Sequence, residues 1–346
     1  MKEPRAESRE PRAERGEPRA ESREPRAASR EPRTESCEPR AASGVDMAIE
    51  VAGIRMRNPV MTASGTFGYA QEFEPYLDLN RLGALVVKTI TRLPRPGNPA
   101  PRIVETPAGM LNAIGLQNVG IEAFIRDNLP YLRRLTPPLI VNVAGESVED
   151  FRELTKRISD QEGVAGIELN VSCPNVAGGL DFSTDPKLTY QVVKAAREAT
   201  RLPLIPKLSP NVTDIRAIAK AAEEAGADGI SLINTLVGMA IDVRTRRPKI
   251  ANVTGGLSGP AIRPVAVRMV WQAARAVKLP IIGMGGICCG EDAAEFLIAG
   301  ATAVAVGTAN FIDPTNAIKV IAELEQYCLA NGISDIRHLV GSLQLP

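Results

Sequence analysis

The sequence predicts a (β/α)8 TIM barrel of the α/β class, preceded by an N-terminal tail that takes no part in the fold. From residue 59 onward, short apolar runs alternate with helical stretches, the pattern of repeated strand–helix units around a parallel sheet. Eight apolar runs can be counted, and nearly all end in glycine or a polar residue. A barrel of about 250 residues with insertions accounts for this length. A doubly wound open sheet is the alternative.

Residues 1–46 are predicted to be a disordered repeat tail, and residues 47–346 the barrel domain. Glu-Pro-Arg recurs at positions 3, 10, 17, 24, 31 and 38. The proline in each repeat excludes both a coiled coil and a membrane helix, because it removes a helix donor and clashes with the preceding turn. The tail carries 11 basic and 11 acidic residues, unlike a nucleic-acid arm or a transit peptide. Binding of a partner through this tail is an alternative.

The strands are expected where short apolar runs are bounded by turn residues. They are residues 59–63, 85–88, 139–143, 166–171, 204–208, 229–233, 281–284 and 303–306. Helices are expected between them, at residues 147–161, 186–200, 213–225, 261–277, 290–299 and 314–330. Thr213-Asp214 and Asp313-Pro314 are the expected helix starts.

Composition excludes several functions. Outside the tail, 30 basic residues face 29 acidic ones, which argues against nucleic-acid binding. No apolar run is long enough to span a membrane and no signal peptide precedes the barrel, so a cytoplasmic protein is expected. The five cysteines lack paired spacing and the only histidine is His338. A metal site and a histidine-based triad are therefore not expected.

Polar and glycine residues at the strand ends predict a functional site at one mouth of the barrel, where barrel enzymes carry their chemistry. These strand ends are Ser64-Gly65, Lys88-Thr89, Asn142, Asn170 to Cys173, Lys207, Asn234-Thr235, Gly285-Gly286 and Gly307-Thr308. The glycines after the last two strands indicate a phosphate site. The chain lacks a Gly-x-Gly-x-x-Gly fingerprint and a Walker loop, which disfavours a dinucleotide or triphosphate ligand.

Cys173 is the candidate catalytic residue. It follows the buried run 166–171 directly and is flanked by the carboxamides of Asn170 and Asn175, a setting suited to removing a proton from a polar substrate. Lys88 and Lys207 have two interpretations. A buried lysine either forms a Schiff base or keeps its charge and stabilises a reduced flavin or a substrate carboxylate.

Together these stretches resemble the class 1 dihydroorotate dehydrogenases, flavoenzymes of pyrimidine biosynthesis built on this barrel. The matching stretches are Asn58-Pro59, Ala63 to Gly68, Lys88-Thr89, Asn112 to Asn118, Asn170 to Asn175, Lys207 to Pro210, Asn234-Thr235, Gly255 to Gly259 and Gly285-Gly286. They agree in order and spacing from residue 47 to about residue 335, and the tail has no counterpart.

The resemblance implies one FMN per subunit and a substrate site for dihydroorotate or orotate. The implied FMN residues are Ser64, Lys88, Thr89, Asn142, Asn170, Lys207, Ile233, Gly259, Gly285, Gly286, Gly307 and Thr308. The implied substrate residues are Lys88, Asn112, Ala113, Ile114, Gly115, Leu116, Asn170, Asn175, Asn234 and Thr235. Asparagines suit a pyrimidinedione, since a carboxamide both donates and accepts hydrogen bonds.

In that family Cys173 would take a proton from carbon 5 of dihydroorotate while a hydride leaves carbon 6 for FMN. The stretch Met110 to Asn118 is similar to that of the NAD-linked class 1B catalytic subunit. The resemblance then implies a partner subunit carrying FAD and a [2Fe-2S] cluster, and a homodimer core within a heterotetramer.

Other functions remain open at this point. They are a fumarate-linked class 1 enzyme, a non-redox barrel enzyme acting on a phosphorylated metabolite, and a flavin enzyme reducing a tRNA base, against which the neutral charge argues. In another interpretation the chain is an interaction protein, and deletion of residues 1–46 would abolish its role.

Overall fold

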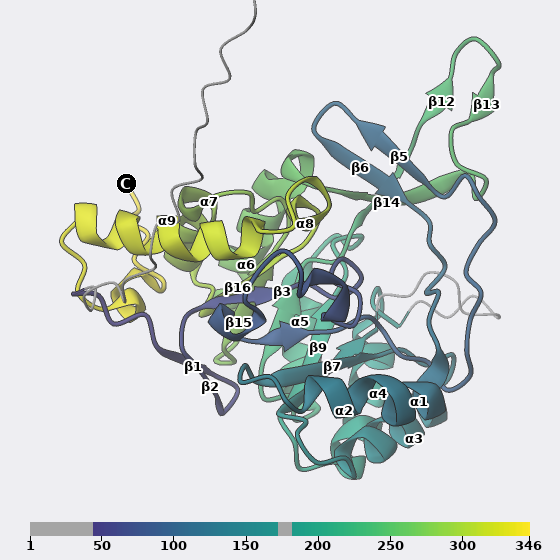
Figure 1. Ribbon diagram of the computed structural model, residues 1–346, viewed down its shortest axis with the longest axis horizontal. Helices are drawn as coiled ribbons and strands as arrows, with labels where there is room; N and C mark the ends of the chain where they lie inside the picture. The colour runs from purple at the N-terminus through teal and green to yellow at the C-terminus, as the bar shows by residue number, and fades with distance from the viewer. Residues whose placement is uncertain (1–43, 172–181) are drawn as a thin grey trace, which may run out of the picture. The chain divides into compact units, whose positions relative to one another are not determined.

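A closed parallel barrel forms the centre of the computed structural model, which describes residues 44–171 and 182–346. Its strands are β3 (Val60–Thr62), β4 (Leu85–Val86), β7 (Leu139–Val143), β8 (Gly166–Asn170), β9 (Leu204–Leu208), β10 (Ile230–Leu232), β15 (Ile281–Met284) and β16 (Ala303–Val306). They pair in the order β3-β16-β15-β10-β9-β8-β7-β4. A parallel bridge between Met61 and Ala84 closes the ring by joining β3 to β4. The predicted TIM barrel is therefore confirmed (Figure 1), and the open sheet is excluded.

The predicted strands agree with the barrel strands because each is a mainly apolar run whose residues are buried. For β7, β9, β15 and β16 the predicted and observed bounds are identical. The other barrel strands are shorter than expected, by one to two residues at one or both ends.

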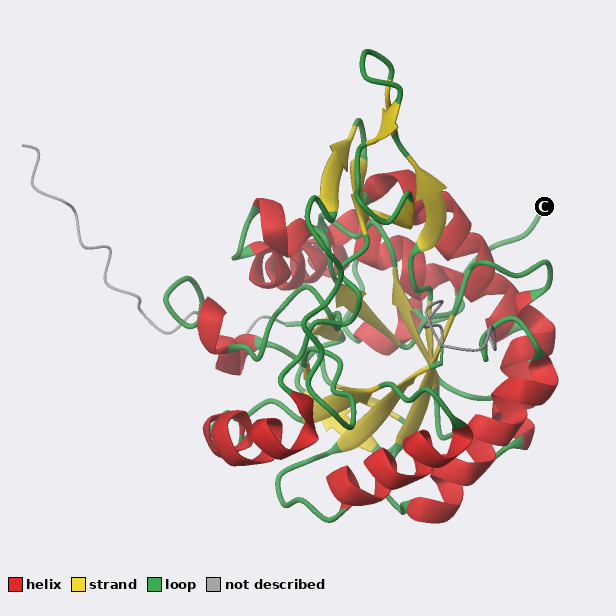
Figure 2. Ribbon diagram, turned by 90° about the vertical axis from the view of Figure 1, so that its right-hand side faces the viewer, coloured by secondary structure: helices red, strands yellow, loops and turns green. Residues whose placement is uncertain are grey.

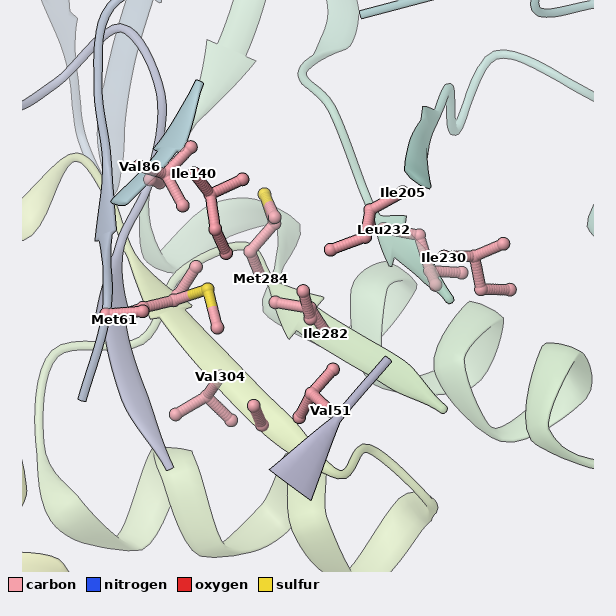
Figure 3. Close-up of a cluster of buried hydrophobic side chains, with 14 of the residues drawn as sticks. Val51, Met61, Val86, Ile140, Ile205, Ile230, Leu232, Ile282, Met284 and Val304 are labelled. Carbon is pink, nitrogen blue, oxygen red and sulfur yellow. The ribbon is translucent and has the colours of Figure 1, made fainter. Parts of the chain in front are cut away.

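The barrel interior changes from apolar to polar along the strands. Side chains alternate between the two faces of a strand, and strand register places Glu168 beside Ile205 and Asn170 beside Lys207 on the inward face. Figure 3 shows Ile140, Ile205 and Ile282 in the apolar cluster. The polar side chains lie nearer the carboxyl ends of the strands, and they pack on the apolar layer below them.

Helices cover the outside of the barrel, as Figure 2 shows for the red elements around the yellow strands. The longer ones are α3 (Val148–Ser159), α4 (Pro186–Ala199), α5 (Ile215–Glu224), α6 (Arg263–Ala274), α7 (Gly290–Ala299) and α9 (Asn316–Ala330). Ser147, Asp185 and Asp214 cap α3, α4 and α5 by accepting hydrogen bonds from backbone amides of the first turn. The predicted start at Asp214 is confirmed.

Two helical regions differ from the prediction. The chain between β4 and β7 contains α1 (Gly120–Ala123), the π-helical η3 (Phe124–Asn128) and α2 (Leu129–Leu132), a region for which the sequence predicted no element. Gly120 and Pro130 are poor helix formers, which explains the weak signal. The predicted start at Asp313-Pro314 is wrong by two residues, since Asp313 ends α8 (Ala309–Ile312) and α9 begins at Asn316.

A small antiparallel sheet that was not predicted stands over one end of the barrel. It consists of β11 (Leu236–Met239), β14 (Thr254–Ser258), β6 (Gly109–Asn112) and β5 (Ile103–Thr106), paired in that order. Beyond it lies the hairpin of β12 (Ile241–Asp242) and β13 (Arg247–Pro248), at the upper right of Figure 1. Nearly every residue of these four sheet strands is half-buried or exposed, with Leu111 the buried exception, so they lack the buried apolar run that revealed the barrel strands.

The hairpin of β1 (Ile49–Val51) and β2 (Ile54–Met56) closes the opposite end of the barrel. A Cβ on Gly166, the first residue of β8, would lie 2.8 Å from the side chain of Ile54, which places the hairpin against the amino ends of the strands. Val51 reaches into the apolar cluster of Figure 3.

The folded region begins before the predicted boundary at Met47. Val45 is buried, and the backbone of Asp46 exchanges hydrogen bonds with Ser334 and Ile336. The remaining short helices are η1 (Gln71–Phe73), η2 (Leu79–Arg81), η4 (Pro260–Ile262) and η5 (Ile336–Leu339).

Candidate active site

A cavity of about 560 Å³ lies between the carboxyl ends of the barrel strands and the small antiparallel sheet. The barrel contributes residues that end the strands, such as Lys207 and Met284, and the sheet contributes residues such as Asn112 and Ser258. A volume of this size is typical of pockets for cofactors and small substrates. The sheet therefore roofs the site that the strand ends predicted.

Carboxamides and hydroxyls line one part of the cavity. Asn234 donates through Nδ2 to Oδ1 of Asn170, at 3.2 Å, and accepts at Oδ1 from the backbone amide of Thr235, at 2.8 Å. On the roof, Asn112 donates to the carbonyl of Gly256 at 3.3 Å. These contacts hold the amides in place at the cavity wall, where a carboxamide can both donate and accept hydrogen bonds.

Two lysines bring positive charge into the cavity. Lys207 is almost fully buried and follows Pro206 in β9. Burial lowers the pKa of Lys88, the nearby charge of Arg102 lowers it further, and Glu72 partly opposes the shift. In the described part of the chain, neither lysine ammonium group has a hydrogen bond or ion pair with protein. Both are thus suited to binding an anionic group of a ligand.

Glycines let the backbone approach closely at another part of the cavity wall. Gly286 has φ +81°, and a Cβ placed there would lie 2.8 Å from the carbonyl oxygen of Gly259. Gly259 has φ +92°, and a Cβ placed there would lie 2.7 Å from Cα of Gly109 in the roof. Only glycine fits these two positions without displacement, and the resulting surface can present backbone donors to a phosphate.

The structure brings the predicted site residues together in this cavity. The predicted FMN residues that line it are Ser64, Lys88, Thr89, Asn170, Lys207, Ile233, Gly259, Gly285, Gly286, Gly307 and Thr308. The predicted substrate residues that line it are Lys88, Asn112, Ala113, Ile114, Gly115, Leu116, Asn170, Asn234 and Thr235.

Three predicted residues need separate description. Asn142 is fully buried and does not line the cavity; its Nδ2 donates to Glu168 instead. Cys173, the predicted base, and Asn175 lie outside the described residues.

Comparison with known proteins identifies the family. The sequence profile named dihydroorotate dehydrogenase matches residues 46–328. The chain belongs to the dihydroorotate dehydrogenase family. Among its relatives is a protein of Geobacter metallireducens named dihydroorotate dehydrogenase B (NAD(+)), catalytic subunit, with 60% identity over 301 residues. That alignment covers 87% of this chain and 99% of the relative.

A second relative and a solved structure agree with this family. A protein of Desulforudis audaxviator with the same name is 60% identical over 299 residues, covering 86% of this chain and 97% of the relative. A crystal structure of DHODH in complex with ferulenol, from Eimeria tenella, superposes with a TM-score of 0.72 at 25% identity and covers 86% of this chain and 88% of that one. The predicted resemblance to the class 1B catalytic subunit is confirmed at the level of these relatives.

Several cavity residues in this dihydroorotate dehydrogenase family member were not predicted. Arg102, Asn211, Ser258 and Phe311 all line the cavity. Arg102 lies just before β5 and Ser258 ends β14, so both depend on the small sheet that the strand pattern did not reveal. The glycine-rich stretch before Ser258 was the available signal.

The other described thiols lack the features of a reactive cysteine. Burial is the main cause that raises the pKa of Cys288, of Cys289 and of Cys328. A raised pKa leaves little thiolate at neutral pH. None of the helices in the described ranges has the length and apolarity needed to cross a membrane.

Proposed function

We propose that this chain is the FMN-containing catalytic subunit of an NAD-linked dihydroorotate dehydrogenase, which oxidises dihydroorotate to orotate in pyrimidine biosynthesis. The observation that carries the proposal is the 60% identity to a dihydroorotate dehydrogenase B catalytic subunit over 99% of that protein. The lysines, carboxamides and glycines of the cavity supply the chemistry that this reaction needs. We place the enzyme in the cytoplasm.

The cavity suits FMN in size and in chemistry. Gly285, Gly286 and Gly307 line the side that would hold the phosphate, where a Cβ on Gly286 would fill the close approach to Gly259. Lys207 would lie beside the flavin ring, where a positive charge favours the reduced form. Bound FMN supplies an acceptor for the hydride that leaves carbon 6 of dihydroorotate.

The substrate would bind between the barrel and its roof. Lys88 would pair with the substrate carboxylate, and Asn112, Asn170 and Asn234 would match the donors and acceptors of the ring. The roof would also shield the bound substrate from water. Cys173 would remove the proton from carbon 5. The electron pair of that bond would form the double bond to carbon 6 as the hydride leaves carbon 6.

The pKa of Lys88 predicts how the reaction responds to alkaline pH. Because the pKa of this lysine is lowered, the ammonium group loses its proton at a lower pH than free lysine, which has a pKa of about 10.4. We expect kcat/KM for dihydroorotate to fall about tenfold per pH unit above the lowered value, since the charge that binds the substrate is lost.

Lys88→Arg is the matched control, because guanidinium stays charged throughout this range. It should move the alkaline fall of the kcat/KM profile to higher pH even if the absolute activity decreases. An alkaline limb at the same pH in Lys88→Arg would assign that limb to another group.

The name catalytic subunit in the relatives supports a separate electron-transfer partner. We propose that this partner carries FAD and a [2Fe-2S] cluster, and that two copies of the present chain form the core of a heterotetramer.

The isolated chain should therefore reduce artificial acceptors with dihydroorotate but reduce NAD poorly. Steady-state assays with a dye, NAD and fumarate in parallel measure this preference. Efficient NAD reduction by the isolated chain would contradict the need for a partner, and efficient fumarate reduction would move the chain to the other class 1 branch.

A further inference from the structure

Glu168 is a buried carboxylate that the proposed reaction does not use. It lies on β8 and is 2% exposed. Its Oε2 accepts a hydrogen bond from Nδ2 of Asn142 on β7, at 2.5 Å, and its Oε1 accepts one from Oγ of Ser231 on β10, at 2.6 Å. Both partners are fully buried. Both oxygens of Glu168 thus serve as hydrogen-bond acceptors, the only role open to a carboxylate.

The hydrogen bonds of Glu168 cross the barrel interior beneath the cavity. The barrel order is β10-β9-β8-β7, so the bond to Ser231 reaches over the intervening strand β9. The residue of β9 in register with Ser231 is Lys207, and Lys207 is also in register with Asn170. The carboxylate therefore lies in the layer directly below the cationic side chain of the cavity wall.

The hydrogen bonds of Glu168 do not by themselves explain why this position carries a negatively charged residue. Within the described ranges Glu168 has no ion-pair partner, and neither does Lys207. A buried charge is costly unless it is compensated. A neutral glutamine at position 168 could also reach Asn142 on β7 and Ser231 on β10. Connecting these strands therefore does not require a carboxylate.

The hydrogen bond to Glu168 fixes the orientation of the Asn142 amide. Its Nδ2 is used by Glu168, and its Oδ1 is buried without a hydrogen-bond partner among the described residues. An unmet buried acceptor costs free energy. A carboxylate fixes the amide in this orientation because a carboxylate can only accept, whereas a glutamine could donate to Oδ1 and reverse the amide.

We infer that Glu168 is a positioning residue that lowers the reduction potential of bound FMN. This inference rests on the proposed function, because it requires FMN in the cavity. Glu168 acts through Lys207: its negative charge offsets part of the lysine charge that would stabilise the electrons on FMN. In the low-dielectric interior such an offset is felt over several ångströms. A lower potential makes FMN a better donor to an acceptor as weak as NAD.

Glu168→Gln removes the charge and nearly preserves the shape. The potential of bound FMN should shift to a more positive value, measured by anaerobic reduction with a reference dye of known potential. We expect the ratio of reduced to oxidised flavin at a fixed potential to rise about tenfold, equivalent to about 30 mV for a two-electron couple.

Exchanging the carboxylate and the amide between positions 142 and 168 tests whether the FMN potential can be restored. The double variant Asn142→Asp with Glu168→Gln restores one carboxylate and one amide across the same contact, so its FMN potential should return toward the wild-type value. Ser231→Ala removes a hydrogen-bond donor but leaves the charge, and it should shift the potential much less than Glu168→Gln. FMN affinity, measured by fluorescence quenching on titration of the apoprotein, separates loss of binding from a change of potential.

Each outcome decides the inference. An unchanged potential in Glu168→Gln, or an equal shift in Ser231→Ala, would overturn the role of the charge. If Glu168→Gln does not retain FMN, the double variant decides: binding with a near-wild-type potential supports the role, and failure to bind or a positive shift overturns it. Wild-type protein that binds no FMN would instead contradict the proposed function itself.

Discussion

Replacing Cys173 by alanine should slow reduction of the bound flavin by dihydroorotate by about a hundredfold to ten-thousandfold, the usual contribution of general-base catalysis. FMN and orotate should still bind nearly normally, since the substitution removes one sulfur atom and leaves the described lining residues of the cavity unchanged in sequence. Stopped-flow measurement of flavin bleaching isolates this half-reaction from the acceptor. Wild-type bleaching rates in Cys173→Ala would remove the residue from the mechanism.

Two controls sharpen this result. Cys173→Ser should recover only part of the rate, and only at raised pH. At neutral pH a hydroxyl is a much weaker base than a thiolate. Cys288→Ala should bleach at the wild-type rate, since burial raises the pKa of that thiol and it lies outside the cavity wall.

Gly286→Ala should abolish FMN binding or weaken it at least a hundredfold. Its φ of +81° is unfavourable for alanine, and the added Cβ would lie 2.8 Å from the Gly259 carbonyl oxygen and 2.9 Å from Cβ of Arg263. The loop must move, and with it the glycine surface proposed to hold the phosphate. Titration of apoprotein with FMN measures the loss.

Gly332→Ala is the matched control for backbone strain. Gly332 has φ +67°, but nothing lies within 4 Å of the position that an added Cβ would take, and it follows α9 away from the cavity wall. It should lower stability by about 1–2 kcal/mol, the cost of a left-handed alanine, and keep its FMN affinity. Equal loss of FMN in both variants would mean that strain alone, rather than the position of Gly286, is responsible.

The barrel could be predicted because its strands obey a simple rule. A strand buried on both faces is largely apolar, and β15 and β16 stand out as continuous apolar runs for that reason. The small sheet obeys no such rule. Its strands β5 and β11 alternate between half-buried and exposed residues, and β14 begins Thr254-Gly255-Gly256, a composition that favours turns as much as strands.

The site could be predicted in its barrel part and less well above it. Residues at strand ends, such as Lys207 and Asn170, follow from the parallel topology alone. Arg102 reaches the cavity through pairing between distant segments, for which a local pattern holds no information. Asn142 lies at a strand end too, but whether it faces the cavity or Glu168 depends on side-chain hydrogen bonds that no sequence pattern encodes.

Anaerobic titration of the purified full-length chain with dihydroorotate tests the central claim most directly. The account predicts a yellow protein with one FMN per chain, released on denaturation, whose visible absorbance bleaches on addition of dihydroorotate and returns when an artificial acceptor is added. A colourless protein that cannot be reconstituted with FMN, or bound FMN that dihydroorotate leaves oxidised, would contradict it.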